Sequence, residues 1–329
     1  AASDVYKRQL HKFYMEEIMN ENIAFLFPGQ GSQYVGMGKS LYDNIDECKE
    51  IFDMGDEILN MPMKEMIFNG NEDDLKRTKY SQPAILLTSL ACAKAVELRG
   101  ISAKYTLGLS LGEYGALVDS GVISFEDGIK LIKKRAEIMD SAISPEEGSM
   151  MAVLKLSPEK IEELIKRSSE FGLVEGANYN CPGQTVISGE VKALEASVKI
   201  AKELGGRALP LKVSGPFHCS MYKDASYKFY EEVKKADIND FKKVVYSNVK
   251  GAPYKKDDDI KELLRQQIMS PVLFEKSIRD LINKGVDTFI EVGPGKALSG
   301  FVKKIDKSVK IYNVCDIDSL ESTISSLEL

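Results

Sequence analysis

Apolar residues occur in this chain in two patterns: short continuous runs, and longer stretches in which they recur every three or four positions. The first run, Ile23–Phe27, has five apolar residues in succession, which is typical of a strand buried on both faces of a parallel sheet. Similar runs predict strands at 103–107, 244–248, 287–292 and 310–314. Helical stretches lie between them, so we predict an α/β protein with a mainly parallel sheet.

The segment 148–213 has a different order of predicted elements. The order is strand, helix, strand, strand, helix, strand, which is typical of a ferredoxin-like unit. We therefore expect a small ferredoxin-like subdomain at 148–213, inserted into a large domain formed by 20–147 and 214–329. Residues 1–19 lack the apolar core of a signal peptide, and we interpret them as a leader, tag or extension outside the fold.

The composition argues against several classes of function. Hydrophobic residues make up 43% of the 329 residues and charged residues 29%, which is typical of a globular protein with a sizeable core. The net charge of -6 disfavours nucleic acid as a partner, because nucleic-acid-binding surfaces are basic. No apolar run approaches the roughly 18 residues that would span a membrane, so we expect no membrane association.

The cysteines and histidines bear on the compartment and on metal binding. Five scattered cysteines without a C-x-x-C motif favour a reduced, cytoplasmic compartment: Cys48, Cys92, Cys181, Cys219 and Cys315. With two histidines and no Cys/His cluster at ligand spacing, we expect no metal site.

The segment Gly108-Leu109-Ser110-Leu111-Gly112 lies between a predicted strand and a predicted helix. A G-x-S-x-G turn in that position lifts a serine hydroxyl above the end of a sheet, where it can act as a nucleophile. The glycines avoid side chains that would collide with the adjoining strand or helix. An ordinary strand–helix turn is the alternative, so Ser110 is a candidate nucleophile that needs a base nearby.

His218 is the candidate base. The chain has two histidines, and the other, His11, lies in the segment 1–19 that we exclude from the fold. His218 stands where the chain returns from the inserted subdomain, which would place it in a cleft between the two parts. A packed histidine without a catalytic role is the alternative. No aspartate is recognisable by spacing as its partner, so a backbone carbonyl is a candidate for orienting the ring.

The helix predicted at 124–141 carries an arginine on its apolar side. At about 100° per residue, Arg135 falls between Leu131 and Met139, which face the core. A desolvated guanidinium without an anionic partner is costly. The partner is either a carboxylate of the core or an anionic group on a ligand, which a guanidinium binds with two hydrogen bonds. The sequence leaves both open.

Five ordered segments resemble one known family. They are 27–33 (FPGQGSQ), the turn at 108–112 followed by Glu113, Arg135 with Met139, Phe217-His218, and 291–295 (EVGPG). Together they resemble malonyl-CoA:acyl carrier protein transacylases, over nearly the whole chain from Ile23. The resemblance implies an α/β-hydrolase-like core with a ferredoxin-like insert. It also implies transfer of malonyl from malonyl-CoA to the phosphopantetheine thiol of acyl carrier protein in fatty acid synthesis, by a ping-pong mechanism without a bound cofactor or metal.

The resemblance implies roles for individual residues. Ser110 would attack the malonyl thioester while His218 takes its proton, and backbone N–H groups of Gln30 and Leu111 would form the oxyanion hole. Five further positions match family positions at the substrate or behind the histidine. Arg135 would bind the malonyl carboxylate, Gln82, Met139 and Phe217 would lie near the substrate, and the carbonyl of Ser270 would orient the histidine.

Two positions depart from the family pattern: Leu109 stands where the family usually has a histidine, and Pro216 stands where it often has a small residue before Phe-His. Three other functions remain open. A serine esterase or thioesterase shares the nucleophile turn but gives Arg135 no role. A polyketide-pathway acyltransferase has the same chemistry with another carrier, and a catalytically inactive binding subunit is the third.

Overall fold

The computed structural model describes residues 22–327. Their larger sheet has six strands, in the spatial order β10 (Lys310–Val314), β9 (Thr288–Val292), β1 (Ile23–Phe27), β2 (Tyr105–Gly108), β7 (Val244–Ser247) and β8 (Ala252–Pro253). The first five strands in this order pair in parallel, and β8 pairs antiparallel with β7 at the edge. The prediction of an α/β fold with a mainly parallel sheet is confirmed.

The central strand β1 is buried on both faces, which explains its continuous apolar run. Phe25 and Phe27 pack into one cluster of core side chains, while Ala24 and Leu26, which point to the opposite face, pack into a second cluster.

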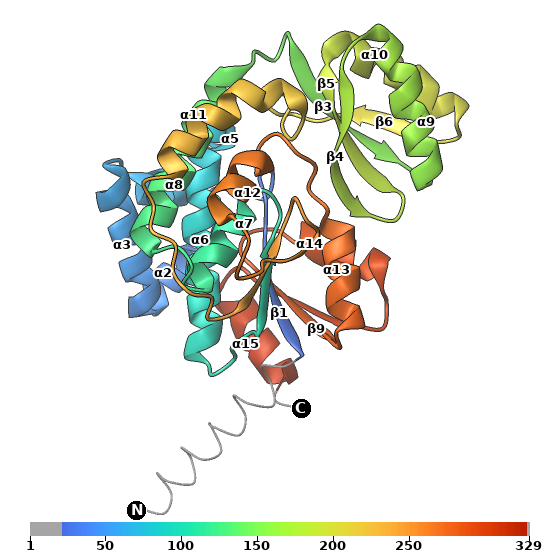
Figure 1. The fold of residues 1–329 in the computed structure, drawn as a ribbon. Helices are drawn as coiled ribbons and strands as arrows, with labels where there is room; N and C mark the ends of the chain where they lie inside the picture. The colour runs from blue at the N-terminus through green and yellow to red at the C-terminus, as the bar shows by residue number, and fades with distance from the viewer. Residues whose placement is uncertain (1–21, 328–329) are drawn as a thin grey trace, which may run out of the picture.

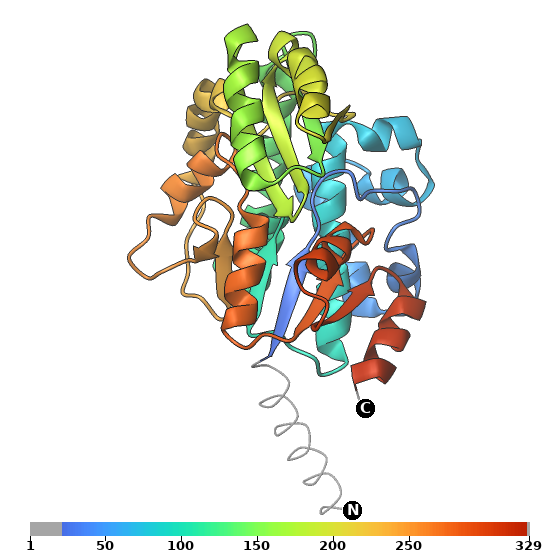
Figure 2. The same ribbon diagram turned by 90° about the vertical axis from the view of Figure 1, so that its right-hand side faces the viewer.

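Helices cover both faces of this sheet (Figures 1 and 2). The helices of this part are α2 (Lys39–Asn44), α3 (Asp46–Leu59), α4 (Met63–Asn69), α5 (Glu72–Lys76), α6 (Thr78–Leu98), α7 (Gly112–Asp119), α8 (Phe125–Ala142), α11 (Lys223–Val233), α12 (Ile260–Gln267), α13 (Phe274–Asn283), α14 (Ala297–Ile305) and α15 (Ile317–Leu327).

Helix α6 is longer than its sequence predicts. Proline disfavours a helix interior, so the sequence indicates a start after Pro83, at residue 84. The structure begins α6 at Thr78, with Pro83 inside it. Ser81, Gln82 and Pro83 are buried, so the packing of this first part outweighs the local cost of the proline. The extra turns carry Gln82 into the core beside α8.

Five helices and strands add to those expected from the sequence: the helices α5, α13, α14 and α15 and the short strand β8. No helix among residues 22–327 combines the length and the apolar character needed to cross a membrane. The interpretation of residues 1–19, including His11, falls outside the described residues.

The chain after α8 forms a second sheet, in which neighbouring strands are antiparallel. The elements follow one another as strand, helix, strand, strand, helix, strand, and they form the upper part of the molecule in Figure 1. The two helices pack on the sheet through an apolar cluster of their own. The spatial strand order is β4 (Val174–Cys181), β5 (Gln184–Glu190), β3 (Gly148–Leu154) and β6 (Arg207–Pro210), and the helices are α9 (Pro158–Ser168) and α10 (Val191–Glu203).

Strand β4 fastens the second sheet to the rest of the molecule. Val272, just before α13, donates a backbone hydrogen bond to the carbonyl of Ala177 at 2.8 Å and accepts one from Tyr179 at 2.9 Å. Glu175 of β4 accepts hydrogen bonds from the backbone N–H and the hydroxyl of Ser220, each at 2.7 Å. Ser220 belongs to the segment by which the chain returns from the second sheet, so β4 helps to fix that segment.

Candidate active site

Ser110 stands in a sharp turn between β2 and α7. Its φ is 56°, in the left-handed region that residues other than glycine rarely adopt. A Cβ added to Gly108 would lie 1.9 Å from the carbonyl carbon of Gly112, and one added to Gly112 would lie 2.1 Å from the carbonyl oxygen of Phe27. Only glycine fits at either position, so the sequence pattern of this turn follows from its close backbone contacts.

Asn248 holds this turn in place. Its Oδ1 accepts a hydrogen bond from the backbone N–H of Ser110 at 2.7 Å, and its Nδ2 donates to the carbonyl of Gly108 at 2.7 Å. Asn248 is buried and directly follows β7, the neighbour of β2. These bonds offset part of the roughly 1–3 kcal/mol that a strained backbone position costs. Asn248 was not among the residues singled out from the sequence, because its contacts depend on the pairing of β7 with β2.

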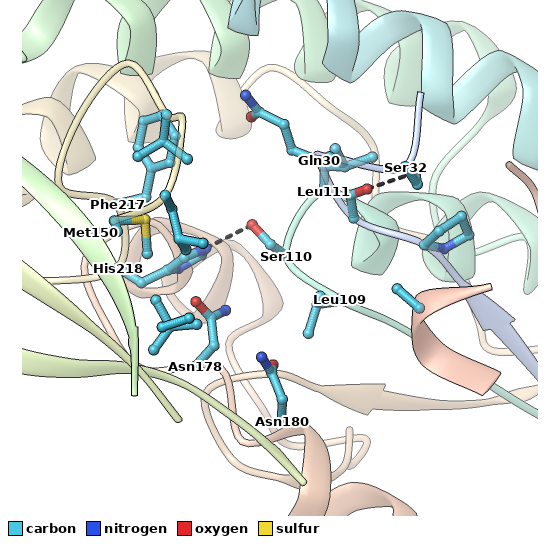
Figure 3. Close-up of a pocket in the computed structure, with 18 of the residues that line it drawn as sticks. Gln30, Ser32, Leu109, Ser110, Leu111, Met150, Asn178, Asn180, Phe217 and His218 are labelled. Carbon is cyan, nitrogen blue, oxygen red and sulfur yellow. Dashed lines mark hydrogen bonds between the residues drawn. The ribbon is translucent and has the colours of Figure 1, made fainter. Parts of the chain in front are cut away.

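The ring of His218 connects the nucleophile to a backbone carbonyl. Its Nε2 lies 2.7 Å from Oγ of Ser110 (Figure 3), and its Nδ1 lies 2.8 Å from the carbonyl oxygen of Gln267. Because a carbonyl can only accept, Nδ1 carries the proton and Nε2 can accept from the serine hydroxyl. The family resemblance implied the carbonyl of Ser270 in this role, and that carbonyl also acts on the ring. The 2.8 Å contact with Nδ1 is made by the carbonyl of Gln267, because α12 ends there and its last carbonyls lack partners within the helix.

Burial changes the protonation of this histidine. The pKa of His218 is lowered to about 4, mainly by burial and further by the positive charge of Arg135. Hydrogen bonds to the carbonyls of Gln267 and Ser270 act in the opposite direction. The imidazole is therefore neutral at neutral pH and can accept the proton of Ser110.

We expect acylation of Ser110 by an uncharged active ester to be independent of pH above about 5 and to fall below that, with a midpoint near the His218 pKa of about 4. Because this ester has no carboxylate to bind at Arg135, the pH dependence of its acylation rate reflects the protonation of His218. The measurement is the burst of p-nitrophenol released from p-nitrophenyl acetate, in the pH range where circular dichroism shows folded protein. A midpoint near the ordinary histidine pKa of 6.5 would contradict this expectation.

Arg135 lies beside the nucleophile with 1% of its surface exposed. Its Nη1 donates to the side-chain oxygen of Gln82 at 2.7 Å. Its Nη2 donates to Oγ of Ser110 at 2.9 Å and to the side-chain oxygen of Gln267 at 3.0 Å. All three acceptors are neutral. The core carboxylate that the sequence allowed as a partner of Arg135 is therefore not among these acceptors. The guanidinium can bind an anion placed next to Ser110.

A cavity of about 260 Å³ lies between the two sheets (Figure 3). Ser110 and His218 line it together with other residues singled out from the sequence: Gln30, Gln82, Leu111, Met139 and Phe217. The second sheet contributes Met150, Ala152, Asn178, Asn180, Gln184 and Val186. Arg135 reaches this site through its bond to Ser110. Within residues 22–327, no group of three or more His, Cys, Asp or Glu side chains is placed to hold a metal ion.

Leu109 is integrated into the turn by packing and backbone contacts. Its side chain packs against the apolar cluster that includes Leu26 and lines the cavity, and its backbone N–H donates to the carbonyl of Phe27 at 3.0 Å. The turn is held by these contacts and by Asn248. A histidine at position 109 is therefore not required to shape it.

Comparisons with known proteins agree with this site. The family model described as "Acyl transferase domain" matches residues 24–319. The chain is 46% identical over 308 residues to the malonyl CoA-acyl carrier protein transacylase of Bacillus subtilis (strain 168), covering 93% of this chain and 97% of that relative. The crystal structure of malonyl CoA-acyl carrier protein transacylase from Clostridium perfringens Atcc 13124 matches with a TM-score of 0.91 and 52% identity, over 93% of this chain and 97% of that one. A malonyl-transacylase in complex with its type II PKS acyl-carrier protein matches with a TM-score of 0.89 and 32% identity, over 93% and 99%.

A serine–histidine pair at the end of a mainly parallel sheet, in a chain that matches the acyl transferase domain, defines an acyltransferase. The relatives described above, which match nearly the whole chain, identify the family within the acyltransferases. The chain belongs to the family of malonyl-CoA:acyl carrier protein transacylases, and the resemblance inferred from its sequence is confirmed.

Proposed function

We propose that this protein transfers the malonyl group of malonyl-CoA to the phosphopantetheine thiol of acyl carrier protein, through a malonyl-serine intermediate. The observation that carries the proposal is the position of Oγ of Ser110, 2.7 Å from Nε2 of His218 and 2.9 Å from Nη2 of Arg135. The histidine activates the hydroxyl, and the guanidinium selects an acyl group that ends in a carboxylate. The names of the relatives agree with this combination.

In the first step, Oγ of Ser110 attacks the thioester carbonyl carbon while Nε2 of His218 takes the hydroxyl proton. Backbone N–H groups of Gln30 and Leu111 donate to the oxyanion that develops, since Leu111 stands at the start of α7 and Gln30 lies along the same cavity. The carbon–sulfur bond then breaks, and His218 returns the proton to the departing CoA thiolate. Malonyl-serine remains.

In the second step, the phosphopantetheine thiol of the carrier enters the cavity and gives its proton to His218. The thiolate attacks the serine ester, the carbon–oxygen bond breaks, and the proton passes to Oγ of Ser110. Arg135 holds the malonyl carboxylate in both steps, while Gln82, Met139 and Phe217 shape the space for the acyl group. Substrates and side chains supply every atom and proton of this exchange, so we propose that no bound cofactor takes part.

Malonyl transfer to holo-acyl carrier protein, followed by mass spectrometry, tests this function. We expect malonyl-CoA alone to leave an adduct on Ser110, and addition of the carrier to remove it. A serine thioesterase would lose the adduct to water equally fast without the carrier, and a binding subunit would form none. Because one similar structure holds a type II PKS carrier, carriers of fatty acid and polyketide synthesis should be compared as acceptors.

We infer that the larger part is α/β-hydrolase-like and that residues 148–213 form a ferredoxin-like subdomain between segments 20–147 and 214–329. The strand order β4, β5, β3, β6 with antiparallel neighbours supports the second assignment. The sharp turn at Ser110, between a parallel strand and a helix, supports the first.

We also propose that the protein works in the cytoplasm. All five cysteines are free thiols, which suits a reducing compartment. The metabolic role of the proposed reaction agrees with that location.

Four exposed lysines lie between α14 and β10: Lys303 and Lys304 on α14, a helix that also lines the cavity, Lys307 after it, and Lys310 at the start of β10. We expect reversal of these charges to slow transfer to an acidic carrier by about tenfold or more at low salt, because rim charges steer encounter. Acylation by malonyl-CoA, measured by mass spectrometry, should keep its rate. Reversal of the exposed lysines of α10 (Lys192, Lys199 and Lys202) is the control, and an equal loss there would refute this docking surface.

A further inference from the structure

Glu113 follows the nucleophile turn, and the mechanism above gives it no part. It lies in the first turn of α7 with 0% of its surface exposed. We propose that Glu113 is a positioning residue for malonyl selectivity: it fixes the side-chain amide of Gln267 so that the amide oxygen faces Arg135. This inference rests on the proposed function, because it concerns how Arg135 is held for the malonyl carboxylate.

The surroundings of Glu113 match a carboxylate. Its oxygens accept hydrogen bonds from the hydroxyl of Tyr254, from the backbone N–H of Asn248 at 3.2 Å, and from Nε2 of Gln267 at 2.7 Å. Burial raises the pKa of Glu113 to about 7, while these donors and the positive charge of Arg135 act in the opposite direction. Three donors around two oxygens favour the acceptor-only, ionised form.

The amide of Gln267 has a donating end and an accepting end, and the structure uses both. Nε2 donates to Glu113 and to the carbonyl oxygen of Ser110, each at 2.7 Å. Oε1 accepts from Nη2 of Arg135 at 3.0 Å. Turning the amide over would set its oxygen against two acceptors and its NH₂ group against the guanidinium. The bonds to Glu113 and to Arg135 are both charge-assisted, and each favours the observed orientation of the Gln267 amide.

That orientation matters because Arg135 is held by amide oxygens. Gln82 binds one terminal nitrogen, and Gln267 binds the other, which also contacts Ser110. Without the Gln267 oxygen, the guanidinium loses one of these two anchors and can turn away from the nucleophile. A misplacement of about 1 Å can cost on the order of 100-fold in rate. An acyl group without a carboxylate makes no use of this alignment.

The test compares malonyl-CoA with acetyl-CoA in the Glu113→Gln variant. An amide at this position offers an NH₂ group to Gln267, which favours the turned orientation of the Gln267 amide. We expect kcat/KM for malonyl-CoA to fall about 10- to 100-fold, mainly through a higher KM, while acylation by acetyl-CoA changes by less than about threefold. Equal losses with both substrates would overturn the proposal in favour of a purely structural role.

Two further variants keep the result interpretable. Gln267→Met removes the amide directly and should show the same selectivity loss, and adding Glu113→Gln to it should cause little further loss, because coupled residues are non-additive. Tyr254→Phe removes another donor to Glu113 but leaves the Gln267 bond, so the malonyl-to-acetyl ratio should stay within about threefold of the wild type. Independent losses in the double variant would overturn the proposal. Failure of wild-type protein to form malonyl-serine would instead refute the proposed function.

Discussion

Replacement of Arg135 by alanine should lower kcat/KM for malonyl-CoA by about 30-fold to several thousand-fold, because truncating one member of a buried charge pair costs roughly 2–5 kcal/mol. The bound substrate would leave its carboxylate in a buried site without its cationic partner. Acetyl-CoA has no carboxylate, so its acylation of Ser110 should fall much less or rise. The measurement is the rate of acyl-enzyme formation from each CoA ester, which gives the preference for malonyl-CoA over acetyl-CoA.

Arg135→Lys is the matched control for this prediction. Lysine keeps the charge but not the planar fork that donates to Gln82, Gln267 and Ser110 together. We expect it to recover only part of the malonyl rate. If Arg135→Ala kept the wild-type preference for malonyl-CoA over acetyl-CoA, Arg135 would not be the carboxylate-binding residue, and a hydrolase with broad acyl specificity would become the better reading of the site.

Replacement of Ser110 by alanine should abolish the acyl-enzyme and reduce transfer by on the order of a million-fold, as loss of a serine nucleophile does in related chemistry. The alanine variant keeps the small side chain that the turn accommodates, so folding should be preserved. Mass spectrometry after mixing with malonyl-CoA gives the first readout, and malonyl transfer to the carrier gives the second.

The double variant Ser110→Ala with His218→Ala provides the internal check. Because the two side chains act as one unit, the double variant should transfer malonyl no more slowly than Ser110→Ala alone. A malonyl adduct that persists in Ser110→Ala would assign the nucleophile to another residue and would contradict the mechanism proposed above.

Much of the fold follows from the sequence, because strands buried on both faces leave continuous apolar runs. β1 and β10 begin and end at the residues expected from those runs. Helix α13 escaped prediction although Phe274, Ile278 and Leu281 recur at helical spacing. A helix of 10 residues depends on tertiary packing more than on local preference, and only the folded chain shows what α13 packs against.

Some residues of the site could likewise be predicted from the sequence, and others could not. Ser110 could be singled out because its turn has a local sequence pattern, and His218 because histidine is so scarce here. Asn248 and Gln267 could not, because their contacts depend on which strand adjoins β2 and on where α12 ends. For the second of these reasons the carbonyl of Ser270 was expected at the histidine, but that of Gln267 was not. Long-range pairing, rather than residue type, defines such supporting contacts.

Ser110 and His218 share an unusual backbone conformation. They are two of the four residues other than glycine with positive φ among residues 22–327, at 56° and 62°. Replacing such residues by glycine is one strategy to relieve the roughly 1–3 kcal/mol that a left-handed conformation costs a residue with a Cβ. Applied to this chain without regard to chemistry, that strategy would choose the nucleophile and its base among its first targets. Selection for thermostability alone would therefore tend to yield robust but inert protein, and libraries of this enzyme should hold both positions constant.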